Sequence, residues 1–181
     1  GVTSERTEDG PSSGSRETVT ADRTGVFVAD TDGERDDAFT VRQSVFVDEQ
    51  GVDQDLEYDE YDDPGADATH FVAYAAGDPI GAARLRSAGD VDLPSGSGDR
   101  SVGKVERVAV AADRRGDGWG RRLMDAVEAH AREVGFDRLT LHAQTHVRGF
   151  YERFEYEAHG EEFEEAGIPH VAMDKALGGG G

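Results

Sequence analysis

Arginines and glycines gather in the middle of the chain, within residues 113–122, where their spacing could bind an anion. They are Arg114, Arg115, Gly116, Gly118, Gly120, Arg121 and Arg122. A helix is expected next, because apolar residues recur at steps of three and four from Leu123 to Val134. The first N–H groups of a helix lack partners within it, and glycines let an anion approach them. The segment predicts a phosphate-binding site, with a loop of solvated arginines as the alternative.

The spacing of this segment fits neither G-x-G-x-x-G nor G-x-x-x-x-G-K-[ST], which excludes the dinucleotide and Walker motifs. Arg115-x-x-Gly118-x-Gly120 resembles the R-x-x-G-x-G/A motif of the GNAT acetyltransferases, which binds the pyrophosphate of acetyl-coenzyme A in that family. The preceding VERVAV (105–110) and the following GRRLMDAVEAHA (120–131) are similar to the strand and helix that flank the family motif.

The resemblance continues on both sides of this motif. GFYERF (149–154) is similar to the family's A/G-F-Y-x-x-x-G-F segment. VFVDEQ (45–50) and GIPHVAM (167–173), together with Gln144 and His146, resemble the ElaA-like branch. The resemblance covers roughly residues 26–177.

The resemblance implies how acetyl-coenzyme A (acetyl-CoA) would bind. The strands at 105–110 and 138–143 are expected to splay apart and leave backbone groups unpaired. Pantetheine would pair with the backbone at Val108 and Val110, and the Val108 N–H would hold the acetyl carbonyl as it becomes an oxyanion. The expected cofactor-binding residues are Val108, Ala109, Val110, Arg115, Gly116, Asp117, Gly118, Trp119, Gly120 and Arg121.

Transfer from a thioester to an amine needs a base for the ammonium proton and a donor for the leaving thiolate. The resemblance makes Tyr151 the candidate acid, with a buried, hydrogen-bonded tyrosine as the alternative. Glu106 is the candidate base, on the face expected to carry Val108 and Val110. It would need a raised pKa, and an ion pair with Arg84 or Arg107 is the alternative. The chain has no cysteine, which favours direct transfer in a ternary complex.

The acceptor pocket is less well defined by the sequence. The candidates are Glu49, Gln50, Gln144, His146 and His170. His170 could also be a second base, and for each histidine a structural role is the alternative. His142 and His146 are four residues apart but straddle a strand end without a third ligand, so no metal site is expected.

Glu155 departs from the family pattern, which has glycine at this position. If the backbone there has positive φ, a residue with a Cβ costs about 1–2 kcal/mol. This departure affects the expected position of the Tyr151 side chain and leaves the expected cofactor site unchanged.

The pattern of the chain predicts a mixed, mostly antiparallel sheet with helices and one parallel crossover. The resemblance implies an α/β (α+β) GNAT fold, in which this twisted sheet is flanked by helices and a splayed parallel strand pair forms the acyl-CoA cleft. Residues 1–23 are expected to be a disordered tail, 24–177 a single domain and 178–181 a flexible glycine tail. Strands are expected at 25–30, 69–74, 80–86, 105–110, 138–143, 156–159 and 168–175, with helices at 34–46, 123–134 and 146–154.

The composition limits the possible partners. The formal net charge is −20, without an extended basic face, which argues against nucleic acid. No apolar run is long enough to span a membrane, and no signal-peptide core is evident, so a cytoplasmic protein is expected. Its oligomeric state is left open between a monomer and a homodimer. The acidity is typical of a halophile, in which molar salt screens self-repulsion. The acidic run in residues 51–68 is expected to be a solvated loop, because its spacing does not fit a calcium loop.

Two functions follow from these observations. The first is an N-acetyltransferase that moves an acetyl group from acetyl-CoA to a primary amine. The alternative is a non-catalytic acyl-CoA-binding sensor or interaction module, since a fold does not decide function.

Overall fold

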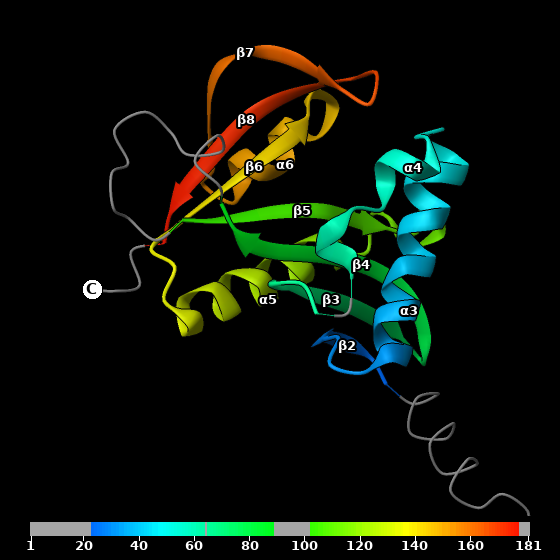
Figure 1. The fold of residues 1–181 in the computed structure, drawn as a ribbon. Coiled ribbons are helices and arrows are strands. Elements are labelled where there is room, and N and C mark those ends of the chain that lie inside the picture. Colours follow the sequence, from blue (N-terminus) through cyan, green and yellow to red (C-terminus); the bar gives the residue numbers. More distant parts are fainter. Residues whose placement is uncertain (1–22, 64, 89–101, 178–181) are drawn as a thin grey trace, which may run out of the picture.

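The computed structural model describes residues 23–63, 65–88 and 102–177, and the predicted tails lie outside them apart from Arg23. The described residues form one seven-stranded sheet in the order β2-β3-β4-β5-β6-β8-β7 (Figure 1). All neighbouring strands are antiparallel except β5 and β6. The mixed, mostly antiparallel sheet is therefore confirmed. Its strands are β2 (Gly25–Val28), β3 (Ala68–Ala75), β4 (Asp78–Ser87), β5 (Val102–Val110), β6 (Arg138–Gln144), β7 (Glu157–Glu165) and β8 (Ile168–Ala176).

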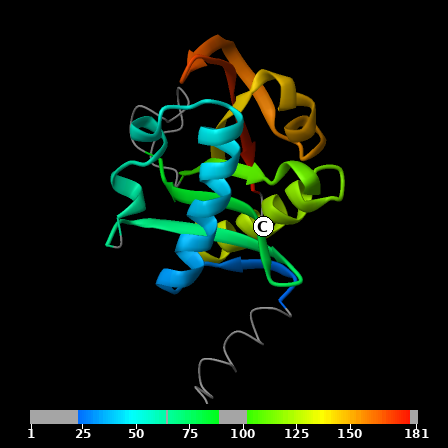
Figure 2. The ribbon, with the colours of Figure 1, turned by 90° about the vertical axis from the view of Figure 1, so that its right-hand side faces the viewer.

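Helices cover both faces of this sheet (Figures 1 and 2). On one face lies α3 (Asp32–Arg42), which continues into a π-helical turn (Gln43–Glu49). A capping box of Thr31 and Glu34 starts α3. On the other face, α5 (Trp119–Val134) buries its apolar stripe. The shorter helices are α4 (Gln54–Glu57) and α6 (Arg148–Arg153), with 3-10 turns at Glu60–Asp62, Ala112–Arg114 and Thr145–Val147.

The parallel neighbours β5 and β6 separate halfway along their length. Their pairing begins at Val102 with Arg138 and ends at Val105 with Leu141. Beyond that point, the described partners of β5 belong to β4 and those of β6 to β8. Figure 1 shows the two strands diverging. The expected splayed pair is present, with the β5 edge after Val105 open on the side of β6.

A bulge lies in β5 where the two strands begin to separate. Arg107 has a φ of 58°, which is unusual for a residue with a Cβ. Ala82 pairs with Ala109 and Arg84 with Glu106, so two residues of β5 oppose a single residue of β4. An extra residue of this kind bends the strand and interrupts its alternation.

The bulge changes which side chains of β5 share a face. Val105, Val108 and Val110 pack with the cluster beneath α5, whereas Ala109 belongs to the cluster beneath α3. Glu106, next to Val105, faces the α3 side with Ala109. The expectation that Glu106 shares a face with Val108 and Val110 is therefore wrong, because simple alternation takes no account of the bulge.

The turn after α6 has the backbone conformation that the family glycine would favour. Glu155 has a φ of 73°, and the Tyr156 N–H donates to the Tyr151 carbonyl at 3.1 Å. This is the Schellman arrangement that ends many helices with a left-handed residue. Glu155 therefore carries a steric cost next to the helix that holds Tyr151.

Candidate active site

A cleft of about 1030 Å³ opens where β5 and β6 separate. Every predicted site residue lines it except Asp117. Segments far apart in the sequence therefore meet there: the π-helical turn, the second half of β5, the turn before α5, the end of β6, α6 and the β7–β8 hairpin.

Three glycines, Gly116, Gly118 and Gly120, shape the backbone at one end of the cleft. Gly118 is the N-cap residue of α5, with a φ of 88° and no side-chain cap. Gly116 also has a φ of 88°. A Cβ on Gly120 would lie 3.2 Å from the Phe150 ring. The first turn of α5 therefore presents its N–H groups without a capping side chain, an arrangement suited to an anion.

Arg115 lies at the same end of the cleft and makes a two-pronged ion pair. Its Nη1 and Nη2 donate to the two carboxylate oxygens of Glu49 at 2.5 and 2.7 Å, and its Nε donates to the Val110 carbonyl at 2.9 Å. The hydrogen bond from Arg115 lowers the pKa of Glu49. Glu49 was predicted for the acceptor pocket, but its carboxylate lies at the predicted phosphate-binding site. A phosphate would compete with it there for the Arg115 guanidinium.

Tyr151 lies on α6 and lines the cleft, with only 7% of its surface exposed. Its ring packs edge-on against Phe150 and Tyr156. Burial raises the pKa of Tyr151, so the hydroxyl stays protonated near neutral pH. No hydrogen bond joins this hydroxyl to another described residue, so the alternative of a hydrogen-bonded structural tyrosine is not observed.

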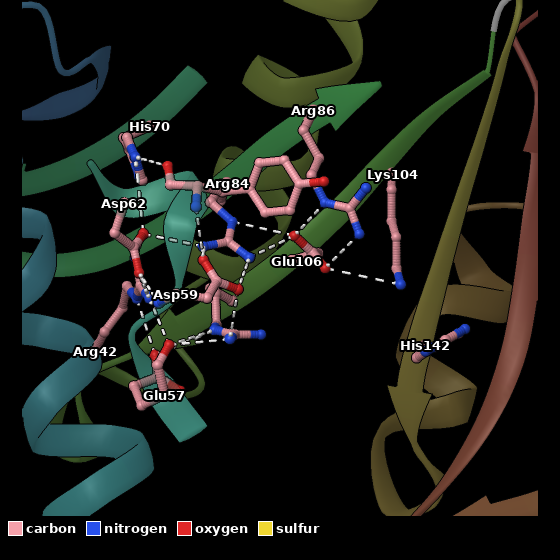
Figure 3. Close-up of polar contacts among 12 residues, drawn as sticks. Arg42, Glu57, Asp59, Asp62, His70, Arg84, Arg86, Lys104, Glu106 and His142 are labelled. Carbon is pink, nitrogen blue, oxygen red and sulfur yellow. Dashed lines mark hydrogen bonds and ion pairs between the residues drawn. The ribbon is translucent and has the colours of Figure 1, made fainter. Parts of the chain in front are cut away.

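Glu106 is held by cations (Figure 3). Its Oε1 accepts from Arg84 Nη2 at 2.6 Å and from Arg86 Nε at 3.0 Å. Its Oε2 accepts from Arg86 Nη2 at 3.2 Å and lies 3.7 Å from Lys104 Nζ. Burial alone would raise the pKa of Glu106, but hydrogen bonds and charges of Arg86 and Arg84 lower it to about 2. The raised pKa that a base requires is absent, and the alternative of an ion pair with Arg84 is present.

Part of the acidic run at residues 51–68 belongs to the same network, so the expected solvated loop is wrong for these side chains. Glu57, Asp59 and Asp62 fold against the buried Arg42 and Arg84. Burial would raise the pKa of Asp62, yet Arg42 and Arg84 lower it to about 2. The carboxylates are folded inward because the two arginines, 1% and 0% exposed, require charged partners.

The acceptor side of the cleft brings together the other predicted residues. Gln144 Nε2 donates to Gln50 Oε1 at 2.9 Å and so joins β6 to the segment after the π-helical turn. His170 is buried, with its Nδ1 2.7 Å from the Ile168 carbonyl. His146 lies exposed in the 3-10 turn after β6.

Sequence reasoning missed a second pair in the cleft, His142 on β6 and Glu165 on β7. The His142 Nδ1 lies 2.8 Å from Glu165 Oε2, and both residues line the cleft. From the sequence, His142 was weighed only as a metal ligand. Strand alternation could have indicated its position, because His142 lies between the core residues Leu141 and Ala143 and its side chain must point to the opposite face of the sheet.

Comparisons with known proteins identify the family. Residues 29–177 match the acetyltransferase (GNAT) domain family. A Bacillus subtilis (strain 168) protein named as an acetyltransferase is 39% identical over 138 residues, which cover 76% of this chain and 86% of that protein. The chain belongs to the GNAT acetyltransferase family, and its expected GNAT fold and acyltransferase class are confirmed.

Solved structures agree with this assignment. A crystal structure from Lactobacillus plantarum, named as an N-acetyltransferase, is 31% identical with a TM-score of 0.72, covering 84% of this chain and 97% of that chain. Escherichia coli ElaA is 25% identical with a TM-score of 0.64, covering 80% and 91%.

None of the helices in the described part of the chain has the length and apolar character needed to cross a bilayer. Within the same residues, no group of three or more His, Asp or Glu side chains is arranged to hold a metal ion.

Proposed function

We propose that the protein transfers an acetyl group from acetyl-CoA to a primary amine by direct transfer in a ternary complex. The observation that carries this proposal is the separation of β5 and β6 beyond Val105 and Leu141. It opens a passage between the uncapped N-terminus of α5 and the hydroxyl of Tyr151. Pantetheine would pair with the open edge of β5, as an extended peptide adds to a sheet edge. The similarity to ElaA supports membership of the ElaA-like branch.

Each wall of the cleft would contribute one part of the reaction. The turn from Arg115 to Gly120 would bind the diphosphate through the N–H groups of α5 and the Arg115 guanidinium. The Val108 N–H would stabilise the oxyanion of the tetrahedral intermediate. Tyr151 would protonate the departing sulfur, a role that its protonated, unpaired hydroxyl supports. In this proposal Glu106 balances the charges of Arg84 and Arg86 and does not act as the base.

Calorimetric titration of acetyl-CoA in molar KCl tests the binding part. We expect micromolar affinity in the wild type and at least a hundred-fold weaker binding in Arg115→Glu, because a carboxylate would then face the diphosphate. Arg148→Glu is the matched control, since Arg148 pairs with Glu152 and lies outside the cleft. Absence of binding by folded wild type would remove the basis of the proposal.

Turnover separates the enzyme from a non-catalytic sensor. With Tyr151→Phe we expect unchanged acetyl-CoA affinity and a loss of turnover of about a hundred-fold or more, the usual range for a general acid. A wild type that binds acetyl-CoA tightly and releases no coenzyme A thiol with any amine would favour the sensor instead.

A further inference from the structure

The two faces of the sheet divide the cleft into two chemically different sides. Leu141 and Ala143 lie in the core cluster that also contains Tyr151. His142 stands between them on β6, so its side chain faces the opposite side, where Gln144 bonds Gln50. A proton donor for the departing sulfur thus occupies one side of the passage. An incoming amine would meet His142 on the other.

The contacts of His142 leave one ring nitrogen available. Its Nδ1 lies 2.8 Å from Glu165 Oε2, and its ring packs edge-on against Phe163 with centroids 4.9 Å apart. A carboxylate accepts hydrogen bonds but does not donate them, so Nδ1 carries the proton and Nε2 carries the lone pair in the neutral ring. No described residue forms a hydrogen bond with Nε2. The side chain is 26% exposed and lines the cleft.

We propose that His142 is the general base of the transfer, and that Glu165 is the positioning residue that orients its ring. This inference rests on the proposed function. The acceptor ammonium gives a proton to His142 Nε2, and the resulting amine attacks the thioester carbonyl carbon. A C–N bond forms and the C–S bond breaks. The sulfur takes a proton from Tyr151, whose hydroxyl regains one from the second N–H of the attacking nitrogen. The products are the amide, the thiol and one proton released from His142.

The other titratable groups near His142 are committed to different contacts. Glu106 binds Arg84 and Arg86, and Figure 3 shows no contact that joins His142 to that network. His170 uses Nδ1 on a backbone carbonyl, and its Nε2 lies 3.7 Å from Glu165 Oε1. Burial would raise the pKa of Glu165, but the hydrogen bond from His142, with charges that include His170 and Lys104, lowers it. Glu165 therefore stays anionic beside His142.

A pair of acceptor probes of similar size tests this assignment. Ethylamine is almost entirely protonated near neutral pH, whereas 2,2,2-trifluoroethylamine is mostly unprotonated and needs little help from a base. Release of coenzyme A thiol can be followed with a thiol reagent, because the protein has no cysteine. The variant is His142→Asn, whose amide N–H can still donate to Glu165. His159→Asn is the matched control, since His159 pairs with Asp174 and lies outside the cleft.

For His142→Asn we expect kcat with ethylamine to fall at least a hundred-fold, within the usual range for general base catalysis. The kcat with trifluoroethylamine should fall less than about five-fold, and acetyl-CoA affinity should not change. Glu165→Gln should give a smaller loss, again selective for ethylamine, because an amide still accepts from Nδ1. Equal losses for both amines, or none, would overturn the assignment. Failure of the proposed function would instead appear in the wild type, as no thiol release with either amine.

Discussion

Two carboxylates face the same cleft from opposite walls, and their surroundings differ. Glu106 on β5 accepts hydrogen bonds from two arginines and lies near a lysine. Glu165 on β7 binds the ring of His142 at 2.8 Å and is about half exposed. The first carboxylate neutralises buried cations, while the second orients a group whose other side is open.

The difference shows that the neighbours of a carboxylate, rather than its presence beside the splayed strands, decide its chemistry. A base needs a free lone pair and a pKa near the working pH. Glu106 lacks the second, because the hydrogen bonds and charges of Arg86 and Arg84 lower its pKa to about 2. Glu165 acts through His142, whose Nε2 has no hydrogen-bond partner among the described residues.

The largest expected effect comes from neutralising Glu106. We expect Glu106→Gln to lower the free energy of unfolding by about 3 kcal/mol, because it leaves the fully buried Arg84 with one charge less to balance it. The control is Glu165→Gln, which should change stability by less than about 1 kcal/mol, as for an exposed pair. Urea unfolding in molar KCl measures both. A stable Glu106→Gln protein without turnover would restore Glu106 as a candidate base.

Lowering the pH should remove the stabilisation that ionised Glu106 gives to the folded protein. Glu106 has an ordinary pKa of 4.5, lowered to about 2 in the folded protein. A lowered folded pKa stabilises the protein above the unfolded value, and this stabilisation is lost as pH falls through the folded value. The difference in unfolding free energy between wild type and Glu106→Gln should therefore shrink by about 3 kcal/mol between pH 5 and 2. A difference that does not vary with pH would contradict this account of the ion pairs.

The sequence was sufficient to predict the fold, and it indicated many of the residues that line the cleft. The hydrophobic periods of α3 and α5, the glycine spacing of 116, 118 and 120, and the alternation of the strands are local properties of the chain. Their placement around one cleft follows from a resemblance that spans most of the chain. Asp117, which does not line the cleft, is the one predicted member that the structure leaves outside.

Features that depend on distant residues could not be predicted in the same way. The bulge at Arg107 reverses the alternation of β5 without a glycine to mark it. The cations around Glu106 come from β4 and β5, and the partner of His142 comes from β7, 23 residues further along the chain. Pairings of this kind become visible only when the strand register is known.

A smaller effect is expected at Glu155, where the backbone matters more than the carboxylate. Its φ of 73° favours glycine, so Glu155→Gly should raise the unfolding free energy by about 1 kcal/mol. Thermal unfolding measures the change, with Glu152→Gly in the neighbouring helix α6 as the control that should destabilise. Equal or lower stability of Glu155→Gly would show that the side chain makes a compensating contact.

The smallest effect is expected at Glu49, another carboxylate that lines the cleft. Like Glu106 it pairs with an arginine, but both partners are exposed, with side-chain fractions of 39% for Glu49 and 43% for Arg115. Pairs of this kind contribute about 0.2–1 kcal/mol, which the diphosphate of acetyl-CoA would have to replace. Glu49→Gln should therefore tighten acetyl-CoA binding by no more than about five-fold, measured by calorimetry beside wild type. Weaker binding in Glu49→Gln would mean that the ion pair orients Arg115 for the diphosphate instead of competing with it.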